Sequence, residues 1–390
     1  MKNNKQRKIG IDARFYGPVG KGLGRYTKEI VDNILKMDTN NYYVIFLSPQ
    51  NYNLFNCTNK NVKKVLVKSR WYSWQEQIIF PWQIYKEKLD LLHFTHFNVP
   101  IFVKTKFIVT IHDLILTKFA TKKASKLNPW YYRLKYFAYK LVISRAIKRA
   151  KKVIAVSEFT KKDIEKKFKA KSEKIAVIYE GVIDFSGFNL EKEDVQFSDK
   201  KLLSSYNIDD KRYLLYVGNA YPHKNLEGLL EVFKKINKDF PSLLLVLVGK
   251  KDYFYKKIIN YNKDIGLDFS KVIFTGYISD KDLQILYKKA LTYVFPSFYE
   301  GFGLPPLEAI SQGCPVLSSN QASLPEILQD AALYFNPYNS IDFYEKMKKI
   351  IKNKHLRQEL INKGEDVVKQ YNWYSSAHDT YKLYLEELKR

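Results

Sequence analysis

The 390-residue sequence has few cysteines, no long hydrophobic run and, over part of its length, no acidic residue. Its two cysteines, Cys57 and Cys314, lie far apart without metal-ligand spacing, so we expect reduced thiols rather than a disulfide or a zinc site. No apolar run reaches the roughly 18 residues that a membrane-spanning helix needs, and no apolar stretch follows the polar, basic N-terminus as in a secretion signal. These absences favour a cytoplasmic protein, held at most to the inner surface of a membrane.

Acidic residues are scarce in the first half of the chain, and the net charge is +26. Residues 1–185 contain 37 Lys and Arg against 14 Asp and Glu, a balance of +23, whereas residues 186–390 contain 29 against 26, a balance of +3. Between Asp113 and Glu158 there are 12 basic residues, interleaved with aromatic ones, and no acidic residue. This composition suits an anionic surface, lipid headgroups more than nucleic acid, although a solvated lysine-rich helix would have the same composition.

Short apolar segments alternate with amphipathic segments along the whole chain. Strands are expected at residues 8–12, 42–47, 65–67, 91–94, 107–111, 152–156 and 175–179, and again at 213–217, 243–248, 272–275, 292–295, 315–318 and 332–335. Helices are expected at residues 23–37, about 129–150, 158–168, 226–237, 280–290, 305–312 and 324–328, with two more to close the chain. Strict alternation predicts an α/β protein whose parallel sheets carry helices on both faces.

The length predicts two domains. Residues 186–211 are polar and lack strand signals, so we expect a linker there, between Rossmann-like domains at 1–185 and 212–368. The last residues, 369–390, are expected to form a helix that crosses back to the N-terminal domain. Ligands of doubly wound sheets bind outside the carboxyl ends of the strands, which predicts a site in a cleft between the two domains.

The strongest chemical signal is the segment 300–308, Glu-Gly-Phe-Gly-Leu-Pro-Pro-Leu-Glu. Gly301 and Gly303 permit a tight turn after the preceding strand, and the prolines suit the first turn of a helix. Free N–H groups at such a helix start form an anion site suited to a diphosphate. Glu300 and Glu308, at the two ends, could then bind the hydroxyls of a sugar and of a ribose. The alternative is one carboxylate stabilised by the helix dipole and one solvated glutamate.

Three further segments contain candidate residues. His112 ends a strand and is predicted to project toward the cleft. The alternative is a structural histidine whose ring nitrogens are hydrogen-bonded within the core. Gly22 and Gly24 are expected in a turn after the first strand, where backbone amides can approach a ligand; their Gly-x-Gly-x-Gly spacing disfavours a nicotinamide site. Asp280 and Asp282 resemble a metal-binding pair, but Ser279 before them predicts a helix cap instead, and we expect no metal.

Taken together, these segments resemble the retaining glycosyltransferase family 4, also described as glycosyl transferases group 1. The segment 300–308 follows Phe-Pro-Ser-x-Tyr, as in the signature of that family. Further blocks match in the order of the family and cover roughly residues 8–340; they lie at residues 20–25, 109–113, 153–158, 216–226, 245–249 and 274–277.

The resemblance implies a GT-B architecture, in which two Rossmann-like domains face each other across a cleft, the first binding the acceptor and the second the nucleotide sugar. Glu300 would contact the transferred sugar, Glu308 the ribose and Lys224 the diphosphate, with His112 close to the donor sugar. Lys224 would neutralise charge on the leaving phosphate, unless it is a surface lysine before a helix. The donor-binding residues carried over by resemblance are Gly22, Gly24, Gly218, Asn219, His223, Lys224, Gly301, Phe302, Gly303, Leu304 and Glu308.

One position departs from the family pattern. Asn219 stands near the place where many members have an arginine, so it offers a hydrogen bond but no charge, and His223 offers a further donor.

The predicted activity is transfer of a hexosyl unit, with retention, from a nucleotide diphosphate sugar to a glycan or lipid-linked acceptor in cell-surface polysaccharide or glycolipid synthesis. The Pro-x-Lys-Asn loop at 222–225 gives a weak preference for a mannosyl donor. No cofactor beyond the donor and no nucleic acid partner are expected, whereas an anionic membrane surface is a candidate partner of the basic half. The alternatives are a nucleotide-sugar epimerase on the same architecture and a non-catalytic protein that binds nucleic acid or another anionic surface.

Overall fold

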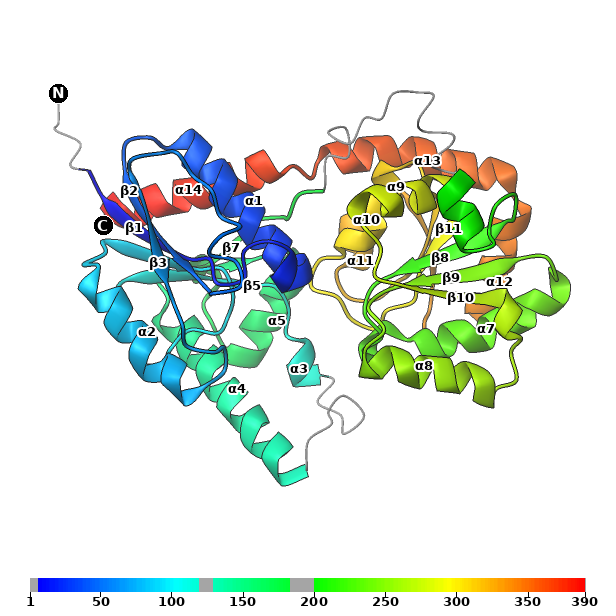
Figure 1. Cartoon of the computed structure of the whole chain (residues 1–390), viewed down its shortest axis with the longest axis horizontal. Coiled ribbons are helices and arrows are strands. Elements are labelled where there is room, and N and C mark those ends of the chain that lie inside the picture. Colours follow the sequence, from blue (N-terminus) through cyan, green and yellow to red (C-terminus); the bar gives the residue numbers. More distant parts are fainter. Residues whose placement is uncertain (1–5, 119–128, 183–199, 390) are drawn as a thin grey trace. The chain divides into compact units, whose positions relative to one another are not determined.

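A computed structural model describes residues 6–118, 129–182 and 200–389 (Figure 1). The chain divides into two compact units: unit 1 comprises Met1–Gly181 with Tyr371–Arg390, and unit 2 comprises Val182–Gln370. In each unit a single parallel sheet is covered by helices on both faces, which confirms the predicted α/β class.

Unit 1 contains a seven-stranded sheet with the order β3-β2-β1-β4-β5-β6-β7. Its strands are β1 Lys8–Asp12, β2 Tyr42–Leu47, β3 Val62–Leu66, β4 Leu91–Phe94, β5 Phe107–Ile111, β6 Lys152–Ala155 and β7 Ile175–Val177. Its helices are α1 Lys21–Met37, α2 Trp74–Lys86, α3 Ile115–Lys118, α4 Pro129–Arg149, α5 Glu158–Phe168 and α14 Trp373–Lys389. The central strands are nearly all apolar because helices bury both of their faces.

Helices α2 and α4 pack on one face of this sheet and share one hydrophobic core with its strands. Phe80 and Ile84 of α2 and Ile143 and Ile147 of α4 belong to that core. On the opposite face α14 lies beside α1, so the C-terminal helix is part of unit 1 (Figure 1).

Unit 2 contains a six-stranded sheet with the order β10-β9-β8-β11-β12-β13. Its strands are β8 Tyr213–Val217, β9 Leu244–Val248, β10 Val272–Gly276, β11 Thr292–Phe295, β12 Val316–Ser319 and β13 Ala332–Phe335. Its helices are the 3-10 turn η5 Pro222–Lys224 and α7 Leu226–Asp239, α8 Tyr253–Asp264, α9 Asp280–Lys289, α10 Leu304–Ser311, α11 Leu324–Leu328, α12 Ser340–Lys352 and α13 Lys354–Lys369.

The strand order reverses in the same way in both sheets. The chain adds strands to one side of the first strand and then returns to its other side, so the order reverses between β1 and β4 and again between β8 and β11. A crevice opens outside the carboxyl ends of the strands at such a switch point, and ligands of doubly wound sheets bind there. The loops after β1, β4, β8 and β11 are therefore where a site is expected.

Several element predictions were wrong. Helices α2, α3 and α8 had not been predicted, and three helices, α12, α13 and α14, follow β13 instead of two. Of the linker expected at 186–211, residues 186–199 lie outside the described residues, and residues 200–205 are helical. No described helix combines the length and the apolar character that spanning a bilayer requires.

Candidate active site

An ion pair connects the two loops at the switch point of unit 2. Lys224 ends η5 after β8, and Glu300 follows β11. The Nζ atom of Lys224 lies 2.6 Å from Oε1 of Glu300, and each side chain is only 10% exposed. The Lys224 ammonium also lies 5.1 Å from the centre of the Phe295 ring. The structure thus brings together two of the three predicted catalytic residues at the position where a doubly wound sheet binds its ligand.

The loop between Glu300 and α10 is held by a buried hydroxyl. Oγ of Ser323 lies 3.1 Å from the carbonyl oxygen of Glu300 and 2.8 Å from that of Phe302. Gly303 has φ +113°, and a Cβ there would lie 2.9 Å from Cδ2 of Leu324. The positive φ therefore favours glycine at this position, and a side chain there would also displace Leu324.

The anion site at the start of α10 has fewer donors than an ordinary helix start. Leu304 is the first helical residue, and Pro305 and Pro306 follow it without N–H groups. The amides of Gly303 and Leu304 are therefore the donors that this terminus can offer. A diphosphate bound here would depend more on the Lys224 ammonium than on helix amides.

Glu308 lies on α10 and is buried. The hydroxyl of Tyr287 donates to its Oε2 atom over 3.4 Å. The ribose contact of Glu308 stays a prediction. The alternative interpretation required a solvated loop glutamate at Glu300, whereas that side chain is only 10% exposed.

The loop after β8 provides hydrogen-bonding groups. Oδ1 of Asn219 accepts from the Tyr221 amide over 3.2 Å, and its carbonyl accepts from the Tyr216 hydroxyl over 2.7 Å, so this residue shapes the turn. Gly218 precedes it, and a Cβ there would lie 2.7 Å from the same hydroxyl. Burial and the charge of Lys224 lower the pKa of His223 to about 3, so its imidazole is neutral near pH 7. Lys224, not His223, is therefore the source of positive charge in this loop.

His112 follows β5 in unit 1, and both of its ring nitrogens face acceptors. Nδ1 lies 2.8 Å from Oε1 of Glu180, and Nε2 lies 2.9 Å from the carbonyl oxygen of Thr95. A carboxylate and a carbonyl can only accept, so this arrangement favours the imidazolium, in which both nitrogens donate. Burial opposes that charge, but the hydrogen bond and charge of Glu180 outweigh it and raise the pKa of His112.

Glu180 and Thr95 were not anticipated from the sequence. Glu180 is buried and lies directly before Gly181, the last residue of the first segment of unit 1. The edge of the Tyr26 ring meets His112 with centroids 4.5 Å apart. Both ring nitrogens of His112 are satisfied within unit 1, as those of a structural histidine would be, so its contact with the donor sugar stays a prediction.

The two glycines predicted in a turn lie within a helix instead. The 3-10 turn Pro18–Gly20 leads directly into α1, so Gly22 and Gly24 occupy its first turn. A Cβ at Gly24 would collide with the carbonyl oxygens of Gly17 and Phe15, whereas the space around Gly22 is open. Gly24 is therefore explained by close packing, and the donor contact of both residues stays a prediction.

A charged cluster at the end of β1 was also missed. The guanidinium of Arg14 is fully buried, donates twice to Asp12 over 2.7 Å and once to Glu76 over 2.5 Å. Glu76 also accepts from Asn98 over 2.8 Å. The cluster joins the loop after β1 to helix α2 and holds the carboxyl edge of the sheet in place.

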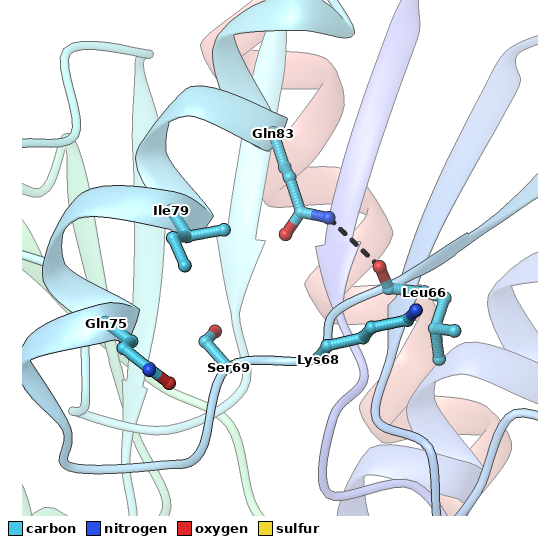
Figure 2. A pocket seen from close by; sticks show the side chains of 6 residues that line it. All are labelled: Leu66, Lys68, Ser69, Gln75, Ile79 and Gln83. Atoms are coloured by element: carbon cyan, nitrogen blue, oxygen red, sulfur yellow. Dashed lines mark hydrogen bonds between the residues drawn. The ribbon is translucent and has the colours of Figure 1, made fainter.

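A cavity of about 360 Å³ lies between the end of β3 and α2 (Figure 2). Its wall combines apolar and polar side chains, namely Leu66, Lys68, Ser69, Gln75, Ile79 and Gln83. Nε2 of Gln83 donates to the Leu66 carbonyl over 3.0 Å, while Oγ of Ser69 and Oε1 of Gln83 are buried without a hydrogen-bond partner among the described residues. None of the predicted site residues lies in this cavity.

Asp280 and Asp282 open helix α9, as predicted. The Asp282 amide donates to Oγ of Ser279 over 3.2 Å, and that hydroxyl in turn donates to the Asp282 carboxylate over 2.8 Å. Ser279 therefore caps the helix, and Asp282 takes part in that cap.

Comparison with known proteins identifies the family. The profile of Glycosyltransferase Family 4 matches residues 20–184, and that of Glycosyl transferases group 1 matches residues 198–367. The O-antigen chain mannosyltransferase RfbU of Salmonella typhimurium is 31% identical over 302 residues, which cover 76% of this chain and 75% of the relative. The chain belongs to glycosyltransferase family 4.

A second relative of this glycosyltransferase is the O-antigen chain mannosyltransferase B of Escherichia coli. It is 28% identical over 246 residues, which cover 62% of each chain.

Solved structures share the fold. A sucrose-phosphate synthase from Thermosynechococcus elongatus superposes with a TM-score of 0.77 at 18% identity, covering 98% of this chain and 99% of the other. HepE of Anabaena, solved in complex with UDP-glucose, superposes with a TM-score of 0.70 at 15% identity, covering 98% of this chain and 100% of the other. These neighbours support the GT-B architecture predicted from the sequence.

Proposed function

We propose that this family 4 glycosyltransferase transfers a mannosyl unit, with retention of anomeric configuration, from GDP-mannose to a saccharide or lipid-linked acceptor of a cell-surface polysaccharide. The observation that carries the proposal is the buried pair of Lys224 and Glu300 at the switch point of unit 2. Both curated relatives named above are mannosyltransferases that act on the O-antigen chain. A UDP-sugar is the competing donor class, because the HepE structure holds UDP-glucose.

In the proposed reaction the bond between the anomeric carbon and the diphosphate oxygen breaks, and an acceptor hydroxyl attacks that carbon from the same face. The acceptor proton passes to the leaving phosphate. Lys224 offsets the charge that develops on the diphosphate, where electrostatic stabilisation contributes most to catalysis. The Glu300 carboxylate, which holds Lys224 in the free protein, would accept hydrogen bonds from sugar hydroxyls once the ammonium turns to the phosphate.

We infer for His112 a fixed positive charge near the donor sugar rather than proton transfer. With Glu180 and Thr95 accepting from its two nitrogens, the ring has no lone pair to take a proton. No metal is included in the proposal, because the charge of Lys224 is available to the diphosphate.

The proposed location is the inner face of a membrane, where a lipid-linked acceptor would be found. The support is the charge balance of +23 in residues 1–185. An anionic lipid surface attracts basic segments within about a Debye length.

The test is a panel of nucleotide sugars, with binding measured by thermal shift and turnover by released nucleotide diphosphate. Because a bound donor stabilises the folded state by mass action, GDP-mannose should raise the melting temperature more than UDP-glucose does. Glu300→Gln and Lys224→Ala should each reduce turnover by roughly 10²-fold or more, as loss of a transition-state contact does. Lys363→Ala, which removes an exposed ion pair with Glu359 in the same unit, is the matched control.

Wild-type turnover in both site variants would refute the assignment. Conversion of the donor to an epimer without any acceptor, followed by NMR, would identify the alternative epimerase instead. The anomeric configuration of the product, read from the same spectra, decides between retention and inversion.

A further inference from the structure

Helices α2 and α4 of unit 1 each have two apolar stripes, one buried and one exposed. The buried stripes belong to the core described above. The exposed stripe of α2 follows the spacing i, i+4, i+8, i+11 and that of α4 the spacing i, i+4, i+7, i+11, so each lies along one side of its helix. We group these exposed side chains with Phe102, in the loop before β5, and call them the apolar face: Trp74, Ile78, Trp82 and Tyr85 of α2, Phe102, and Trp130, Leu134, Phe137 and Leu141 of α4.

These side chains are well exposed. Trp74 is 85% exposed, Trp130 79% and Ile78 68%, values that a solvated helix seldom shows for several large apolar residues in a row. Both helices pack on the same side of the sheet, and the Arg145 guanidinium of α4 donates to the Ile101 carbonyl over 2.9 Å, next to Phe102 (Figure 1).

The exposed charges on the two helices are of one sign. The two helices carry seven basic residues, Lys86, Arg133, Lys135, Lys140, Arg145, Lys148 and Arg149, and one acid, Glu76. Glu76 is buried and paired with Arg14, so it adds no negative charge to the surface. Lys86 lies 3.3 Å from the Trp82 ring centre and Arg133 5.9 Å from that of Trp130, which places cations directly beside the exposed rings.

We propose that the apolar face inserts into the interfacial layer of an anionic lipid bilayer. Tryptophan and tyrosine favour the depth of the headgroups, aliphatic side chains the acyl boundary just below, and flanking lysine and arginine reach back to lipid phosphates. The proposal rests on the proposed membrane-linked acceptor and specifies which helices meet the lipid and how. It requires insertion of side chains, not only the long-range attraction of a basic domain.

Two other occupants fit less well. A second copy of the chain, placed symmetrically, would bring the seven basic residues against their equals without an acid to pair with them. Nucleic acid could bind to the basic and aromatic side chains. It would leave Ile78, Leu134 and Leu141 without an apolar partner, because phosphates and base edges are polar.

The experiment is vesicle flotation of the full chain with zwitterionic vesicles and with vesicles containing about 30 mol% phosphatidylglycerol. The apolar variant combines Trp74→Ser, Ile78→Ser and Trp82→Ser. Its matched control combines Tyr277→Ser and Ile341→Ser, which are 79% and 70% exposed in unit 2. The apolar variant should lose roughly tenfold or more of the bound-to-free ratio, whereas the control should stay within about twofold.

A charge variant, Lys135→Glu with Lys140→Glu, should lose the preference for anionic over zwitterionic vesicles. Equal binding by the apolar variant and the wild type, or an equal loss in the control, would overturn the proposal. Sedimentation analysis could also overturn it: if the wild type and the control are dimers and the apolar variant is a monomer, the apolar face binds a second copy of the chain instead of lipid.

Donor hydrolysis separates this proposal from the proposed function. Release of GDP from GDP-mannose in vesicle-free buffer should be the same in the apolar variant and the wild type. If the wild type binds vesicles but hydrolyses no GDP-mannose, the donor assignment fails and the membrane face stands.

Discussion

The pair of Lys224 and Glu300 should stabilise unit 2 by an amount that unfolding of substituted proteins in denaturant can measure. Replacing Lys224 by alanine leaves the Glu300 carboxylate buried without its cation. Breaking a fully buried pair from one side costs about 3–5 kcal/mol, and since each side chain here is 10% exposed we expect about 2–4 kcal/mol for Lys224→Ala. The combined Lys224→Met and Glu300→Gln variant should recover about half of that loss, because no buried charge remains.

The distribution of tryptophan provides the assay. The five tryptophans, Trp71, Trp74, Trp82, Trp130 and Trp373, all belong to unit 1. Tryptophan fluorescence in urea therefore reports the unfolding of unit 1, while far-ultraviolet circular dichroism reports both units. With a denaturant slope of about 2 kcal/mol per molar, Lys224→Ala should lower the midpoint of the unit 2 transition by about 1–2 M and leave the fluorescence midpoint in place.

Two results would refute the reasoning. A dichroism midpoint within about 0.2 M of wild type would mean that the pair contributes almost nothing, as exposed pairs do. An equal shift of both signals would mean that the two units unfold as one and that the effect is not confined to unit 2. Lys363→Ala, from an exposed pair of unit 2, should move neither midpoint by much.

Three further predictions concern individual residues. Because the folded-state pKa of His112 is raised, its charge stabilises unit 1 fully below the unfolded pKa of about 6.5, and this contribution is lost as the pH rises through the folded pKa. The difference between the fluorescence midpoints of wild type and His112→Gln should therefore be largest near pH 5 and shrink toward pH 9. A difference that stays constant with pH would contradict the imidazolium. Gly303→Ala should lower the stability of unit 2 by about 1–3 kcal/mol and weaken donor binding, because φ of +113° and the Leu324 contact oppose a side chain. An unchanged melting temperature would contradict this prediction and show that the loop adapts. Tyr384→Phe removes the 2.6 Å hydrogen bond to Nδ1 of buried His93 and should cost about 1–2 kcal/mol in the fluorescence transition, while Tyr374→Phe, exposed on the same helix, should cost almost nothing.

Most strands could be predicted because their apolar runs end sharply at polar or glycine residues. Helix α2 could not, although Ser73 and Glu76 form a recognisable N-terminal pair in which Oγ of Ser73 accepts from the Glu76 amide over 3.2 Å. The helix has apolar residues on both sides, Phe80 in the core and Trp82 in solvent, so the single apolar stripe of an ordinary surface helix is absent. Pro81 within the helix weakens the signal further.

The site was predictable to the extent that its residues end strands. Lys224 and Glu300 follow β8 and β11, and parallel strands bring their carboxyl ends to one edge, so their meeting follows from topology. The partner of His112 had no such signal: Glu180 lies 68 residues further along, and only the packing of the segment after β7 brings its carboxylate to the imidazole. The glycines of α1 were misplaced because Gly22 and Gly24 have the composition of a turn, whereas the preceding 3-10 turn already starts the helix at Lys21.

The assignment of α14 to unit 1 has a consequence for how the chain is made. Unit 2 is continuous in sequence, from Val182 to Gln370, and it interrupts unit 1, whose two segments lie before and after it in the sequence. On the ribosome, unit 2 can fold as soon as residue 370 has emerged, whereas unit 1 must wait for the last helix, whose Tyr384 reaches buried His93. Without α14 a nascent N-terminal segment lacks the helix that packs beside α1, so a chain that stops at residue 372, directly before α14, should have a native unit 2 and a unit 1 that depends on chaperones.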